Sequence, residues 1–180
     1  MQLRYINVPH LIAEAGGDPW AINNSLQAGR PMQISDLAEA FHQAGRCTTE
    51  ASTAFAEARR RFEASWNRED GEHPINDSAE VQRATASLGV QAAQLPKIGV
   101  DLENIAAVLA EAQRTGRVLI SALEGQLQEI DNELGQALDL EQSGHPTASQ
   151  RDVVDEHIKG LEHEAITDTK SALGQLESLR

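Results

Sequence analysis

The stretch VQRATASLGVQAAQLPKIGVDLENIAAVL, residues 81–109, decides the fold, and its seven-residue pattern continues to residue 137. The ladder consists of Val81, Leu88, Leu95, Leu102, Leu109, Gly116, Leu123, Ile130 and Ala137. On an α-helix this spacing gathers apolar side chains into one stripe, and such a stripe must be buried against another element. The stretch therefore predicts a long helix that packs along a partner helix.

A second ladder lies upstream and supplies that partner. Its seventh residues are Ile34, Phe41, Thr48, Phe55 and Phe62, and the interleaved positions that we expect in the same stripe are Leu37, Ala44, Ala51, Ala58 and Ser65. Gly71 and Pro74 interrupt the acidic run between the two ladders, because both residues disfavour helix. The sequence therefore predicts an antiparallel hairpin of helices over 33–67 and 78–140.

Shorter helices flank this hairpin. Asn7-Val8-Pro9 predicts a first start and Gly16-Gly17 its end, and Asp18-Pro19 combines an N-cap with a proline at the first helical position. After a linker at 143–146, Thr147 or Ser149 caps a last helix over 147–180. We therefore expect one all-α domain over 1–180, an elongated helical bundle with short helices within 8–29. The amphipathic pattern still runs at Arg180, which favours a piece of a longer protein.

Two points weaken the long helix. Pro96 removes a hydrogen bond, and Thr115-Gly116 is a second weak point, so the segment is either one kinked helix or two helices. Beyond Gly116 we expect the second stripe position to move by one residue, to Leu127 and Leu134. That far half is also expected to stay unpaired and to bind a partner.

Charge and hydropathy exclude several classes of protein. The 180 residues carry a net charge of −13, and residues 101–180 hold 16 acids against 6 bases. Such a surface repels phosphate backbones, so nucleic-acid binding is not expected. The sequence contains no apolar run long enough for a transmembrane segment. Because residues 1–6 lack an apolar run and a small-residue cleavage site, no cleavable signal peptide is expected. The chain is expected to be cytoplasmic or exported by a route that needs no cleavable signal.

No pattern of residues predicts catalysis. Phosphate-binding glycine loops and the G-x-S-x-G motif are absent from the sequence. His157 and His163 are the best metal candidates, but six residues of helix turn them to different faces. Cys47 has no assignable base and is interpreted as an inert thiol. We therefore predict no catalytic, cofactor-binding or metal-binding residue.

Five residues are candidates for protein–protein contacts. Trp66 and Trp20 are large rigid aromatics of the kind that anchor interfaces, although a structural plug at the hairpin turn and a structural cap are the simpler interpretations. Arg59, Arg60 and Arg61 form the only basic cluster, for which a solvated helix face is the simpler interpretation.

Several motifs resemble a known family. These are GGDPWAIN at 16–23, ISDLA at 34–38 with Ala40-Phe41, FEASWN at 62–67 and HPINDS at 73–78. Together they resemble the N-terminal helical domain of predicted actinobacterial, mycobacterial-type hydrolases and related secreted effectors. That domain is itself similar to the Trp-x-Gly helical hairpins of type VII secretion, and the resemblance implies a separate catalytic or toxin domain downstream.

Two departures separate this chain from the secretion hairpins. Trp66 is followed by Asn67-Arg68 instead of x-Gly, and Tyr5 is followed four residues later by Pro9 instead of an acid. The expected function is thus a non-catalytic helical interaction module, linked to type VII secretion or to presenting a downstream enzyme domain. A regulatory or lid part of an appended hydrolase and a homo-oligomer remain as alternatives.

Overall fold

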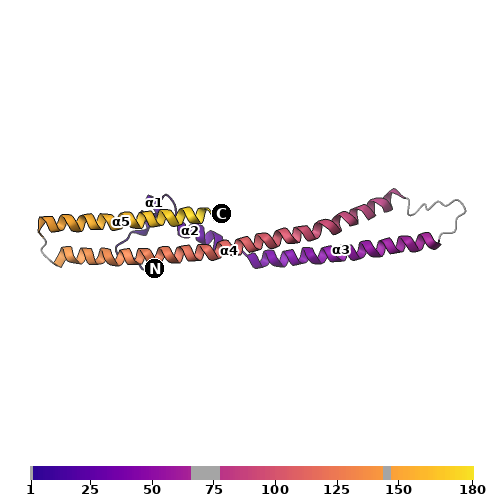
Figure 1. Ribbon diagram of the computed structural model, residues 1–180, viewed down its shortest axis with the longest axis horizontal. Coiled ribbons are helices and arrows are strands. Elements are labelled where there is room, and N and C mark those ends of the chain that lie inside the picture. Colours follow the sequence, from indigo (N-terminus) through magenta and orange to yellow (C-terminus); the bar gives the residue numbers. More distant parts are fainter. Residues whose placement is uncertain (1, 66–77, 144–146) are drawn as a thin grey trace. The chain divides into compact units, whose positions relative to one another are not determined.

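The computed structural model describes residues 2–65, 78–143 and 147–180, and over these ranges the chain is all-α (Figure 1). Trp66 lies outside the described residues. The five helices are α1 (Val8–Ala15), α2 (Pro19–Gln27), α3 (Pro31–Ser65), α4 (Ala79–Ser143) and α5 (Ala148–Glu177). The predicted fold class is confirmed, and each predicted helix has its counterpart.

The helix ends follow the predicted capping chemistry. The Asn7 side chain accepts a hydrogen bond from the His10 N–H at 3.1 Å, and the Asp18 side chain accepts one from the Ala21 N–H at 3.0 Å. Gly16 ends α1 with φ of 85°, a left-handed conformation that glycine adopts without a steric penalty. Thr147 is the N-cap of α5, and its N–H donates to the Gln150 Oε1 at 2.9 Å.

The long helix is not interrupted. α4 runs for 65 residues through both Pro96 and Gly116, so the alternative of two separate helices is wrong. The proline ring lies against Gly45 of α3, where a Cβ atom would come within 2.8 Å of the Pro96 Cγ. A glycine on the partner helix thus gives the ring the space that it needs.

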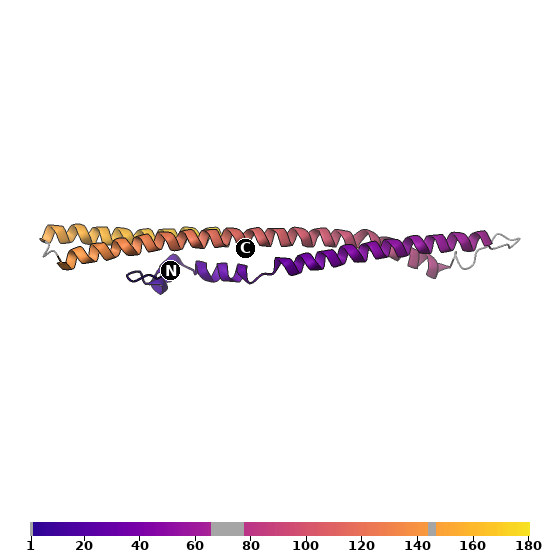
Figure 2. The ribbon, with the colours of Figure 1, turned by 90° about the horizontal axis from the view of Figure 1, so that it is seen from below.

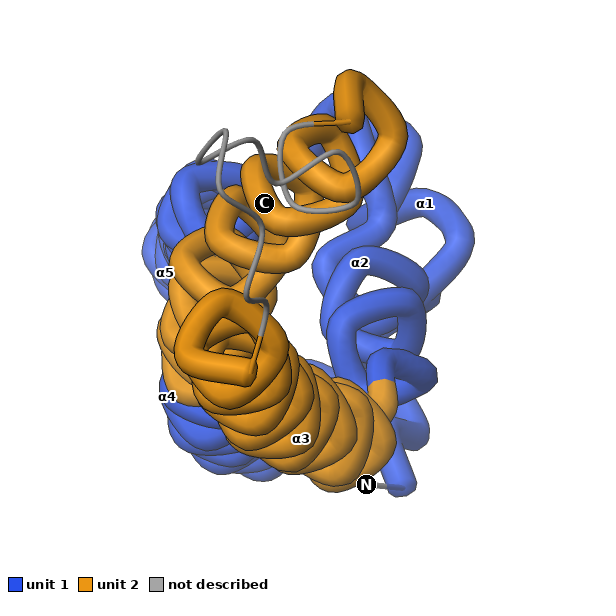
Figure 3. The backbone as a smooth tube through the Cα atoms, turned by 90° about the vertical axis from the view of Figure 1, so that its right-hand side faces the viewer, with its two compact units in different colours: residues 1–29, 109–180 blue, residues 30–108 orange. Residues whose placement is uncertain are grey.

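The described residues group into two compact units, and α4 contributes to both (Figure 3). Unit 1 comprises residues 1–29 and 109–180, and unit 2 comprises residues 30–108. In unit 1 the C-terminal part of α4 lies beside α5 (Figure 2), and both α1 and α2 pack on α5. In unit 2 α3 runs antiparallel to the first part of α4.

The buried stripe of α4 keeps one register along its whole length. The ladder positions are buried or half-buried from Val81 to Ala137, and so are the positions four residues after them, namely Thr85, Ala92, Gly99, Ala106, Gln113, Ile120, Leu127 and Leu134. The expected shift of register beyond Gly116 is therefore wrong. Leu127 and Leu134 belong to the same series that begins at Thr85.

The second set of buried positions on α3 differs from the predicted one. The ladder from Ile34 to Phe62 is half-buried, as predicted, but every interleaved position from Leu37 to Ser65 is exposed. The positions one residue later face the partner helix instead, namely Ala38, Gly45, Ser52 and Arg59. Ala38, Gly45 and Ser52 are small and allow close approach of the two helices, and Gly45 lies against the Pro96 ring. Arg59, the last of the set, is a long polar side chain that is half-buried.

Unit 1 contains the main apolar core. Leu123, Leu127, Ile130 and Leu134 of α4 pack with Leu11 of α1 and with Leu161, Ala165 and Ala172 of α5. The expectation that the half of the chain beyond Gly116 has an unpaired stripe is therefore wrong. α5 and α1 cover it.

We expect Gly45→Ala to lower the free energy of unfolding of unit 2. Overpacking against the rigid Pro96 ring costs about 1–3 kcal/mol, whereas the helix propensity of alanine returns about 1 kcal/mol. Gly89→Ala is the matched control, since no atom lies within 4 Å of its added Cβ, and it should be neutral or stabilising. Urea denaturation followed by circular dichroism measures both, and equal stability of the two variants would contradict the close contact.

Candidate interaction surfaces

A buried carboxylate fastens the N-terminal segment to α4. The side chain of Asp131 is 2% exposed and accepts three backbone N–H groups, from Arg4 at 2.9 Å and from Tyr5 and Ile6 at 2.8 Å each. Burial alone would raise the pKa of Asp131, but these three donors, helped by the Arg4 charge, hold the pKa below its ordinary value. Asp131 thus stays ionised and secures the strap formed by residues 4–6. Gly135, one turn further along α4, leaves room for the Tyr5 ring.

This strap borders a small pocket of unit 1. The pocket has a volume of about 140 Å³, an apolar floor and a polar rim, and it is lined by Tyr5, Ile6, Asn7, His10, Leu11, Leu134, Glu162, Ala165 and Ile166. That volume suits one apolar side chain and is well below that of ordinary ligand sites, which are about 300–1,000 Å³. The pocket therefore supports no small-molecule function.

A second polar network holds α2 on α4. The Gln113 side chain is buried and donates to the carbonyl oxygens of Leu26 and Gly29 at 2.8 Å each, which satisfies the C-terminal end of α2. In return the Gln27 side chain donates to the Gln113 carbonyl at 2.8 Å. Gly116 lets α2 approach, because a Cβ there would lie 2.7 Å from the Asn23 Oδ1. The hydrogen-bond pattern explains why a glutamine occupies the buried stripe.

Trp20 is tied into this same unit. Its indole is half-buried against the core, and the Nε1 donates to the Glu124 Oε1 at 3.2 Å. This geometry agrees with the structural cap that the sequence favoured. The alternative role of Trp20 in contacting a partner stays a prediction.

The three candidate arginines differ in exposure. Arg60 and Arg61 are exposed, and Arg61 forms a 3.5 Å ion pair with Glu57 one turn earlier. Arg59 is half-buried, because it occupies one of the positions of α3 that face α4. The solvated-face interpretation thus fits Arg60 and Arg61 but not Arg59. A contact of any of these arginines with a partner stays a prediction.

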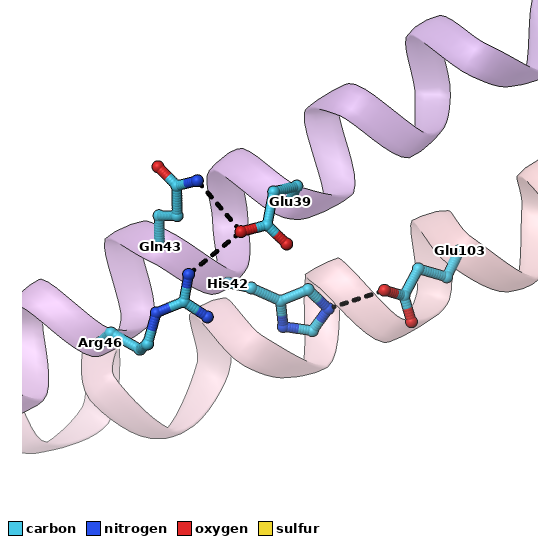
Figure 4. Close-up of polar contacts among 5 residues, drawn as sticks. All are labelled: Glu39, His42, Gln43, Arg46 and Glu103. Atoms are coloured by element: carbon cyan, nitrogen blue, oxygen red, sulfur yellow. Dashed lines mark hydrogen bonds and ion pairs between the residues drawn. The ribbon is translucent and has the colours of Figure 1, made fainter.

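One side of the α3–α4 hairpin is polar (Figure 4). His42 of α3 lies against Gly99, and its Nε2 is 3.2 Å from the Glu103 Oε1 of α4. On the same side Glu39 accepts hydrogen bonds from the side chains of Gln43 and Arg46 at 3.0 Å each, and these bonds lower the pKa of Glu39. Ion pairs as exposed as those of Glu103 and Glu39 contribute little to stability. They show that this side of the hairpin is polar and solvated.

The opposite side of the hairpin is apolar and exposed. The contacts of Gly45 with Pro96 and of His42 with Gly99 fix the antiparallel register, so Leu37 lies level with Ile105 and Ala44 with Ile98. Because the two right-handed helices run in opposite directions, equivalent heptad positions on them face the same side of the pair. We call this side the open face, and it consists of Leu37, Ala44, Ala51 and Ala58 on α3 and Ala84, Gln91, Ile98 and Ile105 on α4, all of them exposed.

The open face holds three of the large apolar residues that unit 2 leaves exposed, and Met32, Val90, Val100 and Val108 are exposed elsewhere on the same unit. Leu37 is 50% exposed, Ile98 40% and Ile105 53%. Toward the end of α3 the face is hollowed by a groove of about 550 Å³, lined by Ala54, Glu57, Ala58, Arg61, Phe62 and Ser65. The heptad spacing predicts Leu37, Ala44, Ala51 and Ala58 in the core, so this surface is not predicted from the sequence. The seven-residue spacing of these four residues does indicate a common helix face, but that face is exposed and does not pack on α4.

Neither metal chemistry nor membrane insertion is indicated within the described residues. Over these ranges no group of three or more His, Cys, Asp or Glu side chains is placed to hold a metal ion. His157 and His163 are both exposed on α5. Of the helices that the structure describes, none is long and apolar enough to cross a bilayer.

Comparison with known proteins shows the family to which the chain belongs. A family model described as the hydrolase N-terminal helical domain matches residues 1–180, so the chain belongs to this family. Two uncharacterized proteins of Mycobacterium tuberculosis, from strains CDC 1551 and H37Rv, are each 69% identical over all 180 residues. The chain spans 27% of the length of each of these relatives. No solved structure matches it.

We expect Asp131→Asn to release the N-terminal strap and destabilise unit 1. Loss of the charged acceptor should cost about 1.5–3 kcal/mol, and exchange of the Arg4, Tyr5 and Ile6 amides should accelerate. The lowered pKa means that the carboxylate stabilises the fold fully above a pH of about 5, and that this contribution is lost as the pH falls through the lowered pKa. The variant should therefore lose less stability than the parent chain on acidification.

Urea denaturation between pH 7 and pH 2, together with hydrogen exchange, measures this effect. Glu129→Gln is the control, because Glu129 is an exposed carboxylate on the same helix, and it should change stability by less than about 0.5 kcal/mol. Equal acid sensitivity of the parent chain and Asp131→Asn would contradict the role of the three N–H donors.

Proposed function

We propose that this domain is a non-catalytic protein–protein interaction module that presents a hydrolase domain following it in the polypeptide. The observation that carries the proposal is the match to the hydrolase N-terminal helical domain over residues 1–180, in relatives of which the chain spans 27%. More than two thirds of each relative is thus available for a separate domain. The described part of this chain contributes helix faces and no grouped catalytic side chains.

The arrangement of polar and apolar residues supports an interaction role. Unit 1 packs around its own core but leaves Val118, Leu140 and Val153 exposed, and unit 2 leaves Leu37, Ile98 and Ile105 exposed on one side of its hairpin. Monomeric proteins rarely expose large contiguous apolar patches to water, and such patches mark interaction sites. On unit 2 the exposed Leu37, Ile98 and Ile105 lie together with alanines on one side of the hairpin. Residues 1–180 are proposed to act as one module, with unit 2 providing the contact surface.

A more specific part of the proposal is the route by which the protein would be exported. The motifs around Trp20 and Trp66 resemble the N-terminal helical domain of predicted hydrolases, and that domain is itself similar to the hairpins of type VII secretion, so we propose that the module associates with that system. The missing x-Gly after Trp66 and the Pro9 that follows Tyr5 by four residues mean that recognition would use helix surfaces instead of the usual short signals.

A second candidate is a lid or regulatory part of the appended hydrolase. It is favoured by the same open face, because an apolar helix surface can cover the mouth of an active site. The two candidates differ in their kinetic consequences. A lid changes the turnover of the hydrolase domain, whereas a presenting module leaves turnover unchanged.

The test compares the longer polypeptide with a version that lacks residues 1–180, using hydrolysis of a p-nitrophenyl ester and distribution of the protein between mycobacterial cells and culture filtrate. We expect kcat to agree within about twofold, since catalysis would reside downstream, and we expect the fraction in the filtrate to fall. A change in kcat of about tenfold would favour the lid. Unchanged kcat with unchanged distribution would contradict the module, and export by a strain without type VII secretion would contradict that route.

A further inference from the structure

We propose that the open face of the α3–α4 hairpin binds the segment that follows residue 180 in the longer polypeptide, and that this segment continues α5 as an amphipathic helix. The occupant of the open face is thus a part of the same polypeptide. The inference rests on the proposed function, because it requires the longer polypeptide in which this domain precedes a hydrolase domain.

α5 lies on one defined flank of α4 in unit 1. Near the start of α5 a groove is lined from α5 by Val153, Val154 and His157 and from α4 by Glu133, Gln136, Ala137 and Leu140. Near the end of α5 a Cβ atom on Gly116 would lie 3.6 Å from the Leu176 Cδ2. Ala137 and Gly116 are ladder residues, and Glu133 precedes a ladder residue by four. α5 therefore covers the ladder and the side of α4 to which Glu133 belongs, which we call the α5 flank.

The open face continues the α5 flank along α4. The positions four residues before the ladder share one side of the helix, because α4 is not interrupted, and they include Ile98, Ile105, Ala112, Leu119 and Glu133. Ala112, one turn from Gly116, is 8% exposed, whereas Ile105 and Ile98 are 53% and 40% exposed. Within the described residues this flank is thus covered as far as α5 extends and uncovered beyond it.

The other flank of α4 is occupied in both units. In unit 1 the Gln113 side chain donates to the end of α2, and in unit 2 Gly99 lies against His42 of α3. Gly99 follows Ile98 directly, so the two positions lie about 100° apart around the helix. α3 therefore cannot cover Gly99 and Ile98 equally, and it leaves the α5 flank of unit 2 to a further helix.

The end of α5 allows a helical continuation toward these residues of α4. Ser178 has φ of −69° and ψ of −16°, which is right-handed helical backbone, and its N–H donates to the Gly174 carbonyl at 3.2 Å. α5 runs antiparallel to α4, with Leu176 level with Gly116 (Figure 1). Ile105 is 11 residues before Gly116. A continued helix therefore reaches the level of Ile105 roughly seven residues after Arg180, and that of Ile98 about seven residues later.

A helix in this position contacts both helices of the hairpin. Leu37 of α3 lies level with Ile105 on the open face, so the segment buries Leu37, Ile105 and Ile98 together. Val108 is 71% exposed, borders Ile105 one turn away on the side turned from α3, and comes under the same helix. The segment therefore needs apolar residues at alternating spacings of three and four, like those with which α5 faces α4.

The first test compares thiol reactivity in the 180-residue chain and in the longer polypeptide, both in a Cys47→Ser background, with labelled sites located by mass spectrometry. We expect the thiol of Ile105→Cys to react at least about tenfold more slowly in the longer polypeptide, because the segment after residue 180 covers it. Val100→Cys is the matched control, since Val100 is 47% exposed in the same unit but on the far side of α4, and its rate should not change. Equal rates for Ile105→Cys in the two chains, or equal slowing at both sites, would overturn the proposal.

Two further measurements identify other occupants of the open face. In the 180-residue chain, slower reaction of Ile105→Cys at about 100 μM than at about 1 μM would show that a second copy binds there. In the longer polypeptide, protection that persists when about 25 residues after Arg180 are replaced by a Gly/Ser linker would show that the hydrolase domain covers the face. Either result overturns the assignment to a continuation of α5.

The second test locates the segment along α4. In the longer polypeptide with Cys47→Ser and Ile105→Cys, a second cysteine is introduced in turn at each position from about the fifth to the ninth residue after Arg180. Under mild oxidation we expect an intramolecular disulfide at one of these positions, or at two that are one helical turn apart, because only one side of the continued helix faces α4. No disulfide at any position, or equal yields at all of them, would overturn the arrangement.

These outcomes are distinguishable from failure of the proposed function. An unprotected Ile105→Cys thiol in a polypeptide whose export is lost when residues 1–180 are deleted would contradict the continued helix alone. A protected thiol in a polypeptide whose export does not depend on residues 1–180 would support the continued helix and contradict the presenting role alone.

Discussion

The stripe on α4 is the constraint on which both units depend. It runs in steps of four and three residues from Val81 to Ala137 without a change of register. Each unit is built by covering a part of that stripe, with α3 in unit 2 and with α1, α2 and α5 in unit 1. A break at Pro96 or Gly116 would rotate one half of the stripe away from its partners, so helix continuity is required for the packing. The close contacts of Gly45 with Pro96 and of Gly116 with Asn23 show how the partner elements fit these two places.

The two units cover the stripe to different degrees. In unit 1 several elements surround α4, and Leu123, Leu127, Ile130 and Leu134 are each at most 5% exposed. A fully buried leucine or isoleucine contributes about 1.5–3 kcal/mol, so these four residues form a substantial core. In unit 2 a single helix covers α4, and the corresponding Leu88, Leu95 and Leu102 are only half-buried. The proposed interaction role follows from this difference, because the less covered unit has apolar surface left for a further element.

The sequence predicted the helices well because their signals are local. Caps at Asn7, Asp18 and Thr147 and breaks at Gly16 act within a few residues, and the heptad ladders identify the ladder positions directly. Leu37 was predicted to face the partner helix, but Ala38 does so. Both residues are apolar, so the sequence pattern alone does not show which of them is buried, and only the packing against α4 does. Here the Pro96 ring and the His42 side chain need glycines opposite them, which fixes the rotation of each helix.

The candidate site was less predictable for a related reason. The strap at Asp131 depends on backbone N–H groups that lie more than 120 residues away in sequence, and no pattern of residue types announces them. The expected binding surface beyond Gly116 was wrong because the covering helices came from both ends of the chain. Exposed large apolar residues are instead found on both units, and Leu37 is the one among them that the heptad pattern had placed in the core.

The rotation of α3 is the central claim, and thiol reactivity tests it most directly. Leu37→Cys and Ala38→Cys are compared in a background with Cys47→Ser. Ala38 is 0% exposed and Leu37 is 50% exposed, so the thiol at 38 should react with a soluble disulfide reagent about tenfold or more slowly than the thiol at 37. Equal rates, or faster reaction at 38, would contradict the register of the hairpin and with it the open face.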